Sequence, residues 1–116
     1  MYGYNGKIGR VNLQARSVKV ENPDEAVHKQ YLGGRGLGAY YLFRELAPKI
    51  DSLGPENIII VAPSVITGIP IAGMSRCSIV SKSPLTGTYG ETEAGGFFGA
   101  ELKAAGFDAL IIESRS

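Results

Sequence analysis

The sequence predicts an α+β fold, in which a mixed β-sheet is packed against helices. Short stretches of alternating or continuous β-branched residues are typical of strands, and longer apolar stretches that end at glycine or proline are typical of helices. The predicted order is ββααββαβ, which lacks the regular strand–helix alternation of a parallel α/β sheet. A chain of 116 residues without a linker or a low-complexity tract suits a single domain, residues 1–116.

The first two predicted strands form a hairpin, because residues 7–13 and 17–21 both alternate between apolar and polar side chains. A helix should follow, with Asn22 as its cap, Pro23 in the first turn and Glu25 in position for a capping box. We expect it to run to Leu32. His28 should lie on the solvent-exposed side, opposite the inward-facing residues Ala26, Val27 and Tyr31.

The remaining predicted elements are more apolar. Residues 37–46 form a second helix that is apolar nearly all round and should be buried. Residues 57–62 and 109–113 are continuous apolar runs, which indicates strands covered on both faces. Residues 76–82 form the strand between them, after a loop of small residues at 64–75.

A glycine-rich stretch at 91–106 is the first candidate for a binding site. Gly95 and Gly96 precede a predicted helix over 97–105, and Gly106 stands where a helix usually ends. The unpaired N–H groups at a helix start attract anions, most often phosphate. Residues 33–38 repeat the pattern in front of the second helix. The alternative is that both glycine pairs only permit tight packing of helix on sheet.

Few charged residues are placed for chemistry. Arg76 begins a strand after the small-residue loop, and its planar guanidinium suits a phosphate or the carbonyl edge of a pterin. Arg35 and Lys82 are weaker candidates of the same kind. Glu91 and Glu93 could hold Mg²⁺ beside a phosphate, or they could simply face solvent.

Composition excludes several classes of function. A net charge of +1 gives no reason to expect a nucleic acid or an anionic membrane as a partner. No apolar run approaches the length of a spanning helix, and no signal-peptide pattern is present. One cysteine, Cys77, and one histidine exclude a disulfide and a transition-metal cluster within this chain. We therefore expect a reducing, cytoplasmic setting.

Five segments together resemble the N-terminal region of the aldehyde ferredoxin oxidoreductase family. They are Tyr2-Gly-Tyr-Asn-Gly6, Tyr31-Leu-Gly-Gly-Arg-Gly-Leu-Gly38, Leu53-Gly-Pro-Glu-Asn57, Arg76-Cys-Ser-Ile-Val-Ser-Lys-Ser-Pro-Leu-Thr-Gly87 and Ala94-Gly-Gly-Phe-Phe-Gly-Ala-Glu-Leu-Lys-Ala-Ala-Gly-Phe-Asp-Ala109. The resemblance implies an enzyme that oxidises aldehydes to carboxylates at tungsten or molybdenum and passes electrons to ferredoxin through a [4Fe–4S] cluster. It also implies a bis-pterin cofactor with its phosphates bridged by Mg²⁺. Such a cofactor rests on an N-terminal domain of two similar mixed-sheet halves, of which this chain resembles one.

The resemblance assigns cofactor contacts to four residues and catalysis to none. Arg76 matches the pterin-contacting arginine of the family, and Gly95 matches a glycine whose backbone meets the cofactor. Glu93 stands where better-known members have an asparagine that touches the cofactor and Mg²⁺, so only a backbone contact would carry over. Gly96 is a looser match. The loop at 63–73 departs from the Gly-Pro-Leu-Thr-Gly pattern of the family.

The family's enzymes are several times longer, and their cluster cysteines and catalytic acids lie beyond the region that resembles this chain. We therefore expect this chain alone to be inactive and to require the remainder of the enzyme or a second subunit. A different hypothesis is a stand-alone, non-catalytic module that binds a phosphorylated ligand or serves in assembly. Half of a two-sheet base should expose apolar surface and associate into a homo-oligomer.

Overall fold

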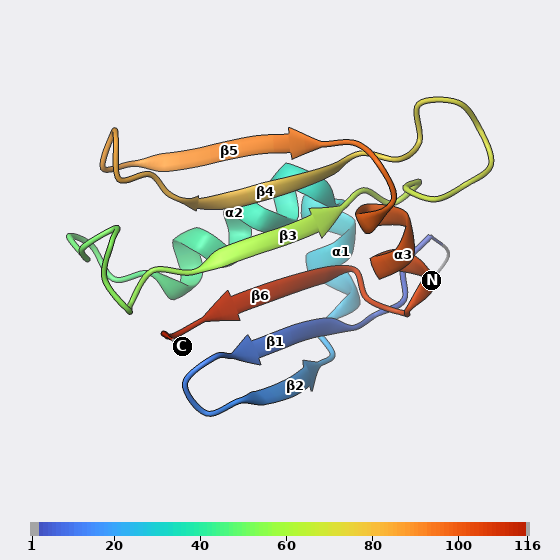
Figure 1. Cartoon of the computed structure of the whole chain (residues 1–116). Coiled ribbons are helices and arrows are strands. Elements are labelled where there is room, and N and C mark those ends of the chain that lie inside the picture. Colours follow the sequence, from blue (N-terminus) through green and yellow to red (C-terminus); the bar gives the residue numbers. More distant parts are fainter. Residues whose placement is uncertain (1–2, 116) are drawn as a thin grey trace.

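The computed structural model describes residues 3–115, so Tyr2 of the first family-like segment lies outside the described residues (Figure 1). Three helices and six strands are present in this part of the chain. Their bounds are β1 (Ile8–Asn12), β2 (Ser17–Glu21), α1 (Glu25–Tyr31), α2 (Gly34–Glu45), β3 (Ile59–Pro63), β4 (Cys77–Lys82), β5 (Tyr89–Ala94), α3 (Phe98–Ala104) and β6 (Ala109–Glu113).

All six strands form one mixed sheet in the order β2-β1-β6-β3-β4-β5. Strands β1 and β6 are parallel, and the other neighbouring pairs are antiparallel. The predicted α+β class and the mixed sheet are confirmed. The predicted order omitted β5, whose Gly90, Glu91 and Glu93 are poor strand formers. Pairing with β4 along its whole length, from Lys82 opposite Tyr89 onwards, overrides this local preference.

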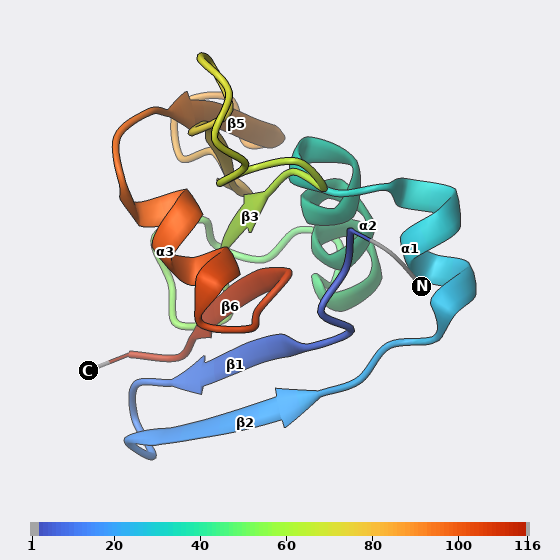
Figure 2. The same ribbon diagram turned by 90° about the vertical axis from the view of Figure 1, so that its right-hand side faces the viewer.

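The helices lie on both sides of the sheet. Helices α1 and α2 cover one face, and α3 packs on the other, as the turned view shows (Figure 2). The main core lies between α2 and the central strands, where Leu37, Ile60 and Ile111 are fully buried. Gly38 of α2 sits directly over Val80 of β4: a Cβ at Gly38 would lie 2.7 Å from Val80 Cγ2. This glycine therefore sets how closely α2 approaches the sheet.

The face that carries α3 is only partly covered. Val18, Val20 and Leu13 are exposed on its β1–β2 side, and Ile59 of β3 is 45% exposed. A shallow hollow on this face is lined in part by Ile59, Ile79 and Ile112. The prediction that β3 is covered on both faces is therefore wrong at Ile59, whereas the expected exposure of apolar surface is confirmed.

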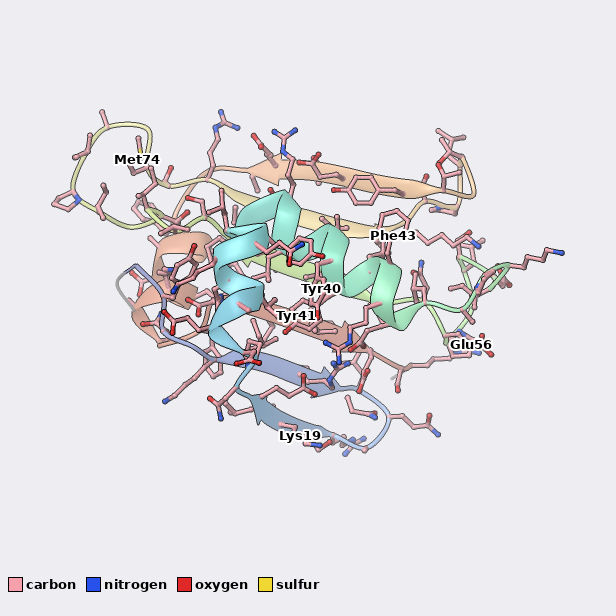
Figure 3. All side chains as sticks on the ribbon, turned by 180° about the vertical axis from the view of Figure 1, so that it is seen from behind. Lys19, Tyr40, Tyr41, Phe43, Glu56 and Met74 are labelled. Atoms are coloured by element: carbon pink, nitrogen blue, oxygen red, sulfur yellow. The ribbon has the colours of Figure 1, made fainter. Side chains whose placement is uncertain are left out.

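Several local predictions about the helices need correction. The residue that caps α1 is Asp24 rather than Asn22, and it makes no capping hydrogen bond with its side chain. Helix α2 begins at Gly34, three residues before its predicted start. The prediction that it is buried nearly all round is wrong at Phe43, which lies on the side toward β5, stacks on Tyr89 and is largely exposed (Figure 3). No helix within residues 3–115 is both long and apolar enough to cross a membrane.

The prediction that His28 is solvent-exposed is wrong, because its side chain is fully buried. The N-terminal segment passes over it: the Tyr4 hydroxyl donates to the His28 carbonyl (3.1 Å), and the two rings lie 4.8 Å apart. Asp108 anchors this segment by accepting hydrogen bonds from the Asn5 and Gly6 amides. His28 Nε2 lies 3.8 Å from Asp108 Oδ2, and neither ring nitrogen has a hydrogen-bond partner among the described residues.

One arginine links the edge hairpin to the rest of the fold. Arg10 of β1 donates to Glu21 of β2, Glu45 of α2 and Glu113 of β6, and its side chain is 14% exposed. The three carboxylates raise the pKa of Arg10, first through the hydrogen bonds to Glu45 and Glu21. The hydrogen bond from Arg10 also lowers the pKa of Glu21 below the usual range of a carboxyl group. This cluster is a stabilising element, far along the sheet from the site described next.

Candidate functional site

The candidate site is a hollow of about 360 Å³ at one end of the sheet. Strand β3 ends there, β4 begins there and β5 ends beside them. The loop over 64–76 and the start of α2 complete its walls. Its lining residues are Gly33, Gly34, Arg35, Ala62, Ser64, Ile66, Thr67, Gly73, Met74, Arg76, Cys77, Ser78 and Glu93.

The structure brings together two of the four residues predicted to contact a cofactor. Arg76 and Glu93 line the same hollow, although 16 residues separate them in the chain. The register of the β4–β5 pair explains why the two residues are close. Ser78 lies opposite Glu93, and Arg76, two residues before Ser78, lies just beyond the paired part of β4. Gly95 and Gly96 follow β5 directly but are not among the lining residues.

The backbone at Gly95 and Gly96 is open. A Cβ added at either position would meet no atom within 4 Å, apart from neighbours in the chain. Gly96 has a φ of +87°, which favours glycine, and Gly95 has no such constraint. Packing among residues 3–115 therefore does not explain a glycine at position 95. The space over it is available to a ligand or to another part of the protein.

Hydrogen bonds within the 64–76 loop fix the backbone of Arg76. The Thr67 hydroxyl donates to the Arg76 carbonyl (2.8 Å) and accepts from the Ser64 amide (2.8 Å). The Gly68 amide donates to the Met74 carbonyl (2.7 Å), which closes the outer part of the loop. Figure 3 shows Met74 on this loop, which projects beyond the end of the sheet. The sequence indicated a loop here but did not indicate roles for Ser64, Thr67, Met74 or Ser78.

The helix start that borders the hollow belongs to α2, not to α3. Gly33 is the cap residue, and no side chain caps the first turn. A Cβ at Gly33 would lie 3.2 Å from both the Pro63 carbonyl oxygen and the Val65 nitrogen, so glycine allows α2 to begin against the end of β3. Gly34 has a φ of +55°. The repeat of the glycine pattern at 33–38 was the signal for this part of the site.

Charges of both signs border the hollow. Arg35, in the first turn of α2, forms ion pairs with Glu93 (3.1 Å) and Glu91 (3.7 Å) of β5. Lys82, a weaker candidate from the sequence, lies outside the hollow and donates to the Ile50 carbonyl (2.7 Å). Arg76 is exposed at the loop end. The hollow thus offers one arginine that already binds carboxylates and a second at its mouth.

One cysteine, Cys77, lines the hollow. Cys77 is buried, and desolvation raises the pKa of its thiol, which keeps it protonated at neutral pH. Among residues 3–115, no three histidine, cysteine, aspartate or glutamate side chains are grouped so that they could hold a metal ion. The hollow instead offers hydrogen-bond donors: the guanidinium of Arg76, the glycine backbone and the uncapped amides at the start of α2. Such donors suit the anionic and carbonyl groups of a ligand. The fold is therefore an α+β domain, and the hollow at the end of its sheet is lined in part by hydrogen-bond donors.

The chain belongs to the aldehyde ferredoxin oxidoreductase family, because residues 8–116 match the family's N-terminal domain. It is 46% identical over 116 residues to a tungsten-containing aldehyde ferredoxin oxidoreductase of Pyrococcus furiosus and 47% identical to that of Thermococcus kodakarensis. Each alignment covers all of this chain and 19% of the relative. The chain therefore spans about a fifth of the length of the curated relatives that it matches.

Two further relatives carry other names. An aliphatic sulfonate oxidoreductase, WOR-like subunit, of Pyrococcus furiosus is 42% identical over 119 aligned residues, again covering all of this chain and 19% of that protein. A solved structure, the active site complex BamBC of benzoyl coenzyme A reductase with 1,5-dienoyl-CoA, superposes with a TM-score of 0.94 at 32% identity. It covers 99% of this chain and 18% of the matched chain. The predicted family and fold are thus confirmed, and the four predicted contacts stay predictions.

Proposed function

We propose that this chain is the part of an aldehyde:ferredoxin oxidoreductase that binds one side of a tungsten- or molybdenum-pterin cofactor. The observation that carries the proposal is the convergence of Arg76 and Glu93, predicted from separate motifs, on one hollow. Membership of the family and the printed names of the tungsten-containing relatives support it. We favour tungsten over molybdenum for the same reason.

The residues at the hollow fit such a cofactor. The guanidinium of Arg76 can form two parallel hydrogen bonds with a phosphate or a pterin edge. The unpaired amides in the first turn of α2 favour an anion. Gly95 and Gly96 expose backbone that a planar ligand can approach closely, because a Cβ there would point into open space. Glu93 would contribute through its backbone, since its side chain is held by Arg35.

The chain's own part in the reaction is to bind and orient. When bound, the metal–pterin group supplies the oxidation of aldehyde to carboxylate, with electrons leaving through a [4Fe–4S] cluster to ferredoxin. We assign the cluster ligands, any catalytic acids and a bridging Mg²⁺ to the complete enzyme and not to this chain. A cytoplasmic location is part of the same proposal.

The open sheet face indicates where another part of the protein attaches. Val18, Val20, Leu13 and Ile59 expose apolar side chains there. In the relatives most of the polypeptide lies outside this domain, so other parts of the enzyme or a partner subunit are implied. We propose that one of these covers the face in the native protein. If neither is present, we expect the chain to associate with itself through the same face.

A second candidate function rests on the exposed apolar side chains of the open sheet face, which suit a subunit of a larger assembly. In that case the chain would be a non-catalytic module that binds a phosphorylated ligand or assists assembly. The two candidates differ in cofactor content, because a stand-alone module would carry no tungsten or molybdenum when purified.

Replacing Arg76 by alanine in the native protein tests the first proposal. We expect at least about a ten-fold loss of retained metal and pterin, because a charge-assisted hydrogen bond typically contributes about 1.5–3 kcal/mol. Lys19→Ala is the matched control: it removes one positive charge on β2, at the opposite edge of the sheet (Figure 3). Equal metal content in both variants and the wild type would refute the role of Arg76.

A further inference from the structure

An ion-pair bridge connects the start of α2 to the edge strand β5 beside the hollow. Arg35 Nη2 lies 3.1 Å from Glu93 Oε1, and Arg35 Nε lies 3.7 Å from Glu91 Oε1. The two glutamates are two residues apart on one strand, so their side chains share a face of the sheet. That face is the one that carries α2, because Arg35 reaches both carboxylates from the first turn of the helix.

The bridge contributes little to the stability of the fold. The Arg35 side chain is 68% exposed and that of Glu93 is 39% exposed. Exposed ion pairs contribute at most about 1 kcal/mol, since solvent screens the charges and the side chains lose conformational freedom. Strand β5 is already paired with β4 along six residues, so it does not depend on this contact. A structural role alone therefore does not explain the arrangement.

Charge at the hollow gives a better explanation. Arg35, Arg76 and Glu93 line it, and Glu91 lies next to it. Without Arg35, the uncompensated Glu93 carboxylate would face the same space as the Arg76 guanidinium, with the Glu91 carboxylate beside it. They would repel an anionic ligand, and they would compete with it for Arg76. With Arg35 in place, both carboxylates are neutralised and turned toward α2.

We infer that Arg35 is a positioning residue of the cofactor site: it neutralises Glu91 and Glu93 and holds them away from the anionic ligand that Arg76 binds. The inference rests on the proposed function. It assigns the carboxylates no favourable contact with the ligand or with a bridging Mg²⁺. Removing their charge should therefore rescue the loss of Arg35.

The test uses the native protein and measures tungsten, molybdenum and pterin per polypeptide, the pterin by fluorescence after oxidation. Arg35→Ala should lower both contents by about ten-fold, as expected for like charges placed against an anion. The triple variant, which combines Arg35→Ala with Glu91→Gln and Glu93→Gln, should recover most of what Arg35→Ala loses. This rescue by charge alone is a result that a purely structural role would not produce.

Arg44→Ala is the matched control, because it removes the same charge from the last turn of the same helix. Arg44 donates to the Tyr40 hydroxyl (2.6 Å) and does not line the hollow. We expect this variant to keep its metal and pterin. Circular dichroism of every variant should match the wild type, since the bridge contributes little to folding.

The outcomes separate the inference from the proposed function. A triple variant that retains no more metal and pterin than Arg35→Ala would overturn the inference, because it would mean that the charge of the carboxylates does not cause the loss. Full retention in Arg35→Ala together with loss in Arg76→Ala would also overturn it, while the proposed function would stand. A wild-type protein without metal and pterin would overturn both.

Discussion

The contact between Gly38 and Val80 sets the height of α2 above the sheet, and Gly38→Ala should therefore disturb the helix. A Cβ at Gly38 would lie 2.7 Å from Val80 Cγ2 and 3.2 Å from Val80 Cβ. Carbon atoms in contact are normally about 3.5–4.0 Å apart. Val80 is fully buried, so it has no free space in which to retreat. The helix must move, and with it Arg35 and the first turn at the hollow.

Two opposing effects determine how much Gly38→Ala changes the free energy of unfolding. Overpacking a well-packed core costs about 1–3 kcal/mol. Alanine stabilises a helix interior by about 1 kcal/mol relative to glycine. The free energy of unfolding should therefore fall by about 1 kcal/mol in Gly38→Ala. In a Val80→Ala background both Cγ atoms are gone, so the same change should become neutral or stabilising, a coupling of about 1–2 kcal/mol.

Hydrogen–deuterium exchange of the peptides that contain α2 and β4, read by mass spectrometry in the native protein, measures this coupling. The change at Gly38 should speed exchange in the wild-type background and not in Val80→Ala. Equal effects in both backgrounds would refute the reasoning, because they would show that the two side chains do not meet. Tungsten content measured in the same samples would report whether displacing α2 also weakens the site.

Three further predictions concern other parts of the fold. Arg10 lowers the pKa of Glu21 in the folded protein. The pair therefore stabilises the fold above the ordinary carboxyl pKa of 4.5, and this contribution is lost as the pH falls through the lower pKa of the folded state. In Arg10→Met the melting temperature should therefore fall less steeply at acidic pH, as measured by thermal unfolding over a series of pH values. Asp108→Ala should cost about 1.5–3 kcal/mol, because it removes the charged acceptor of the partly buried hydrogen bonds from the Asn5 and Gly6 amides, and denaturant titration would measure the loss. Ile59→Lys should weaken the attachment of whatever covers the open face, measured by size-exclusion chromatography with light scattering.

Each of these has a control within the chain. Lys29→Met removes a charge from an exposed pair and should leave the acid limb unchanged. His28→Leu fills the same buried space without unpartnered nitrogens, so it should be neutral or stabilising where Asp108→Ala is not. Phe43→Lys alters an exposed side chain on the helical face and should leave assembly intact. A loss of stability in His28→Leu like that of Asp108→Ala would mean that the imidazole has a partner of its own.

The sequence was a good guide where one pattern dominated a segment. Residues 109–113 and 17–21 matched their strands, and the family-like segments indicated the fold. Strand β5 was missed because its glycine and glutamates are poor strand formers, and only pairing with β4 makes them extended. His28 was misplaced because its burial depends on Tyr4, which lies 24 residues earlier in the chain, and helical periodicity does not report such a contact.

The site was predictable in its parts but not in its assembly. Arg76 and the glycine pattern were visible in the sequence, since guanidinium groups and flexible backbone are recognisable by type. Their grouping depends on the β4–β5 register, which places Glu93 opposite Ser78. The sequence also emphasised the glycines before α3, whereas the hollow is bordered by those before α2. Only the tertiary fold decides which of these two similar glycine-rich loops borders the hollow.

The central claim is that this chain forms part of a metal–pterin site. The most direct measurement is tungsten and molybdenum per polypeptide after anaerobic purification from the native source, with the mass of the polypeptide determined on the same sample. We expect near-stoichiometric metal, mostly tungsten, on a polypeptide several times longer than this chain. A metal-free and pterin-free polypeptide of about this length would contradict the claim and would favour the non-catalytic module.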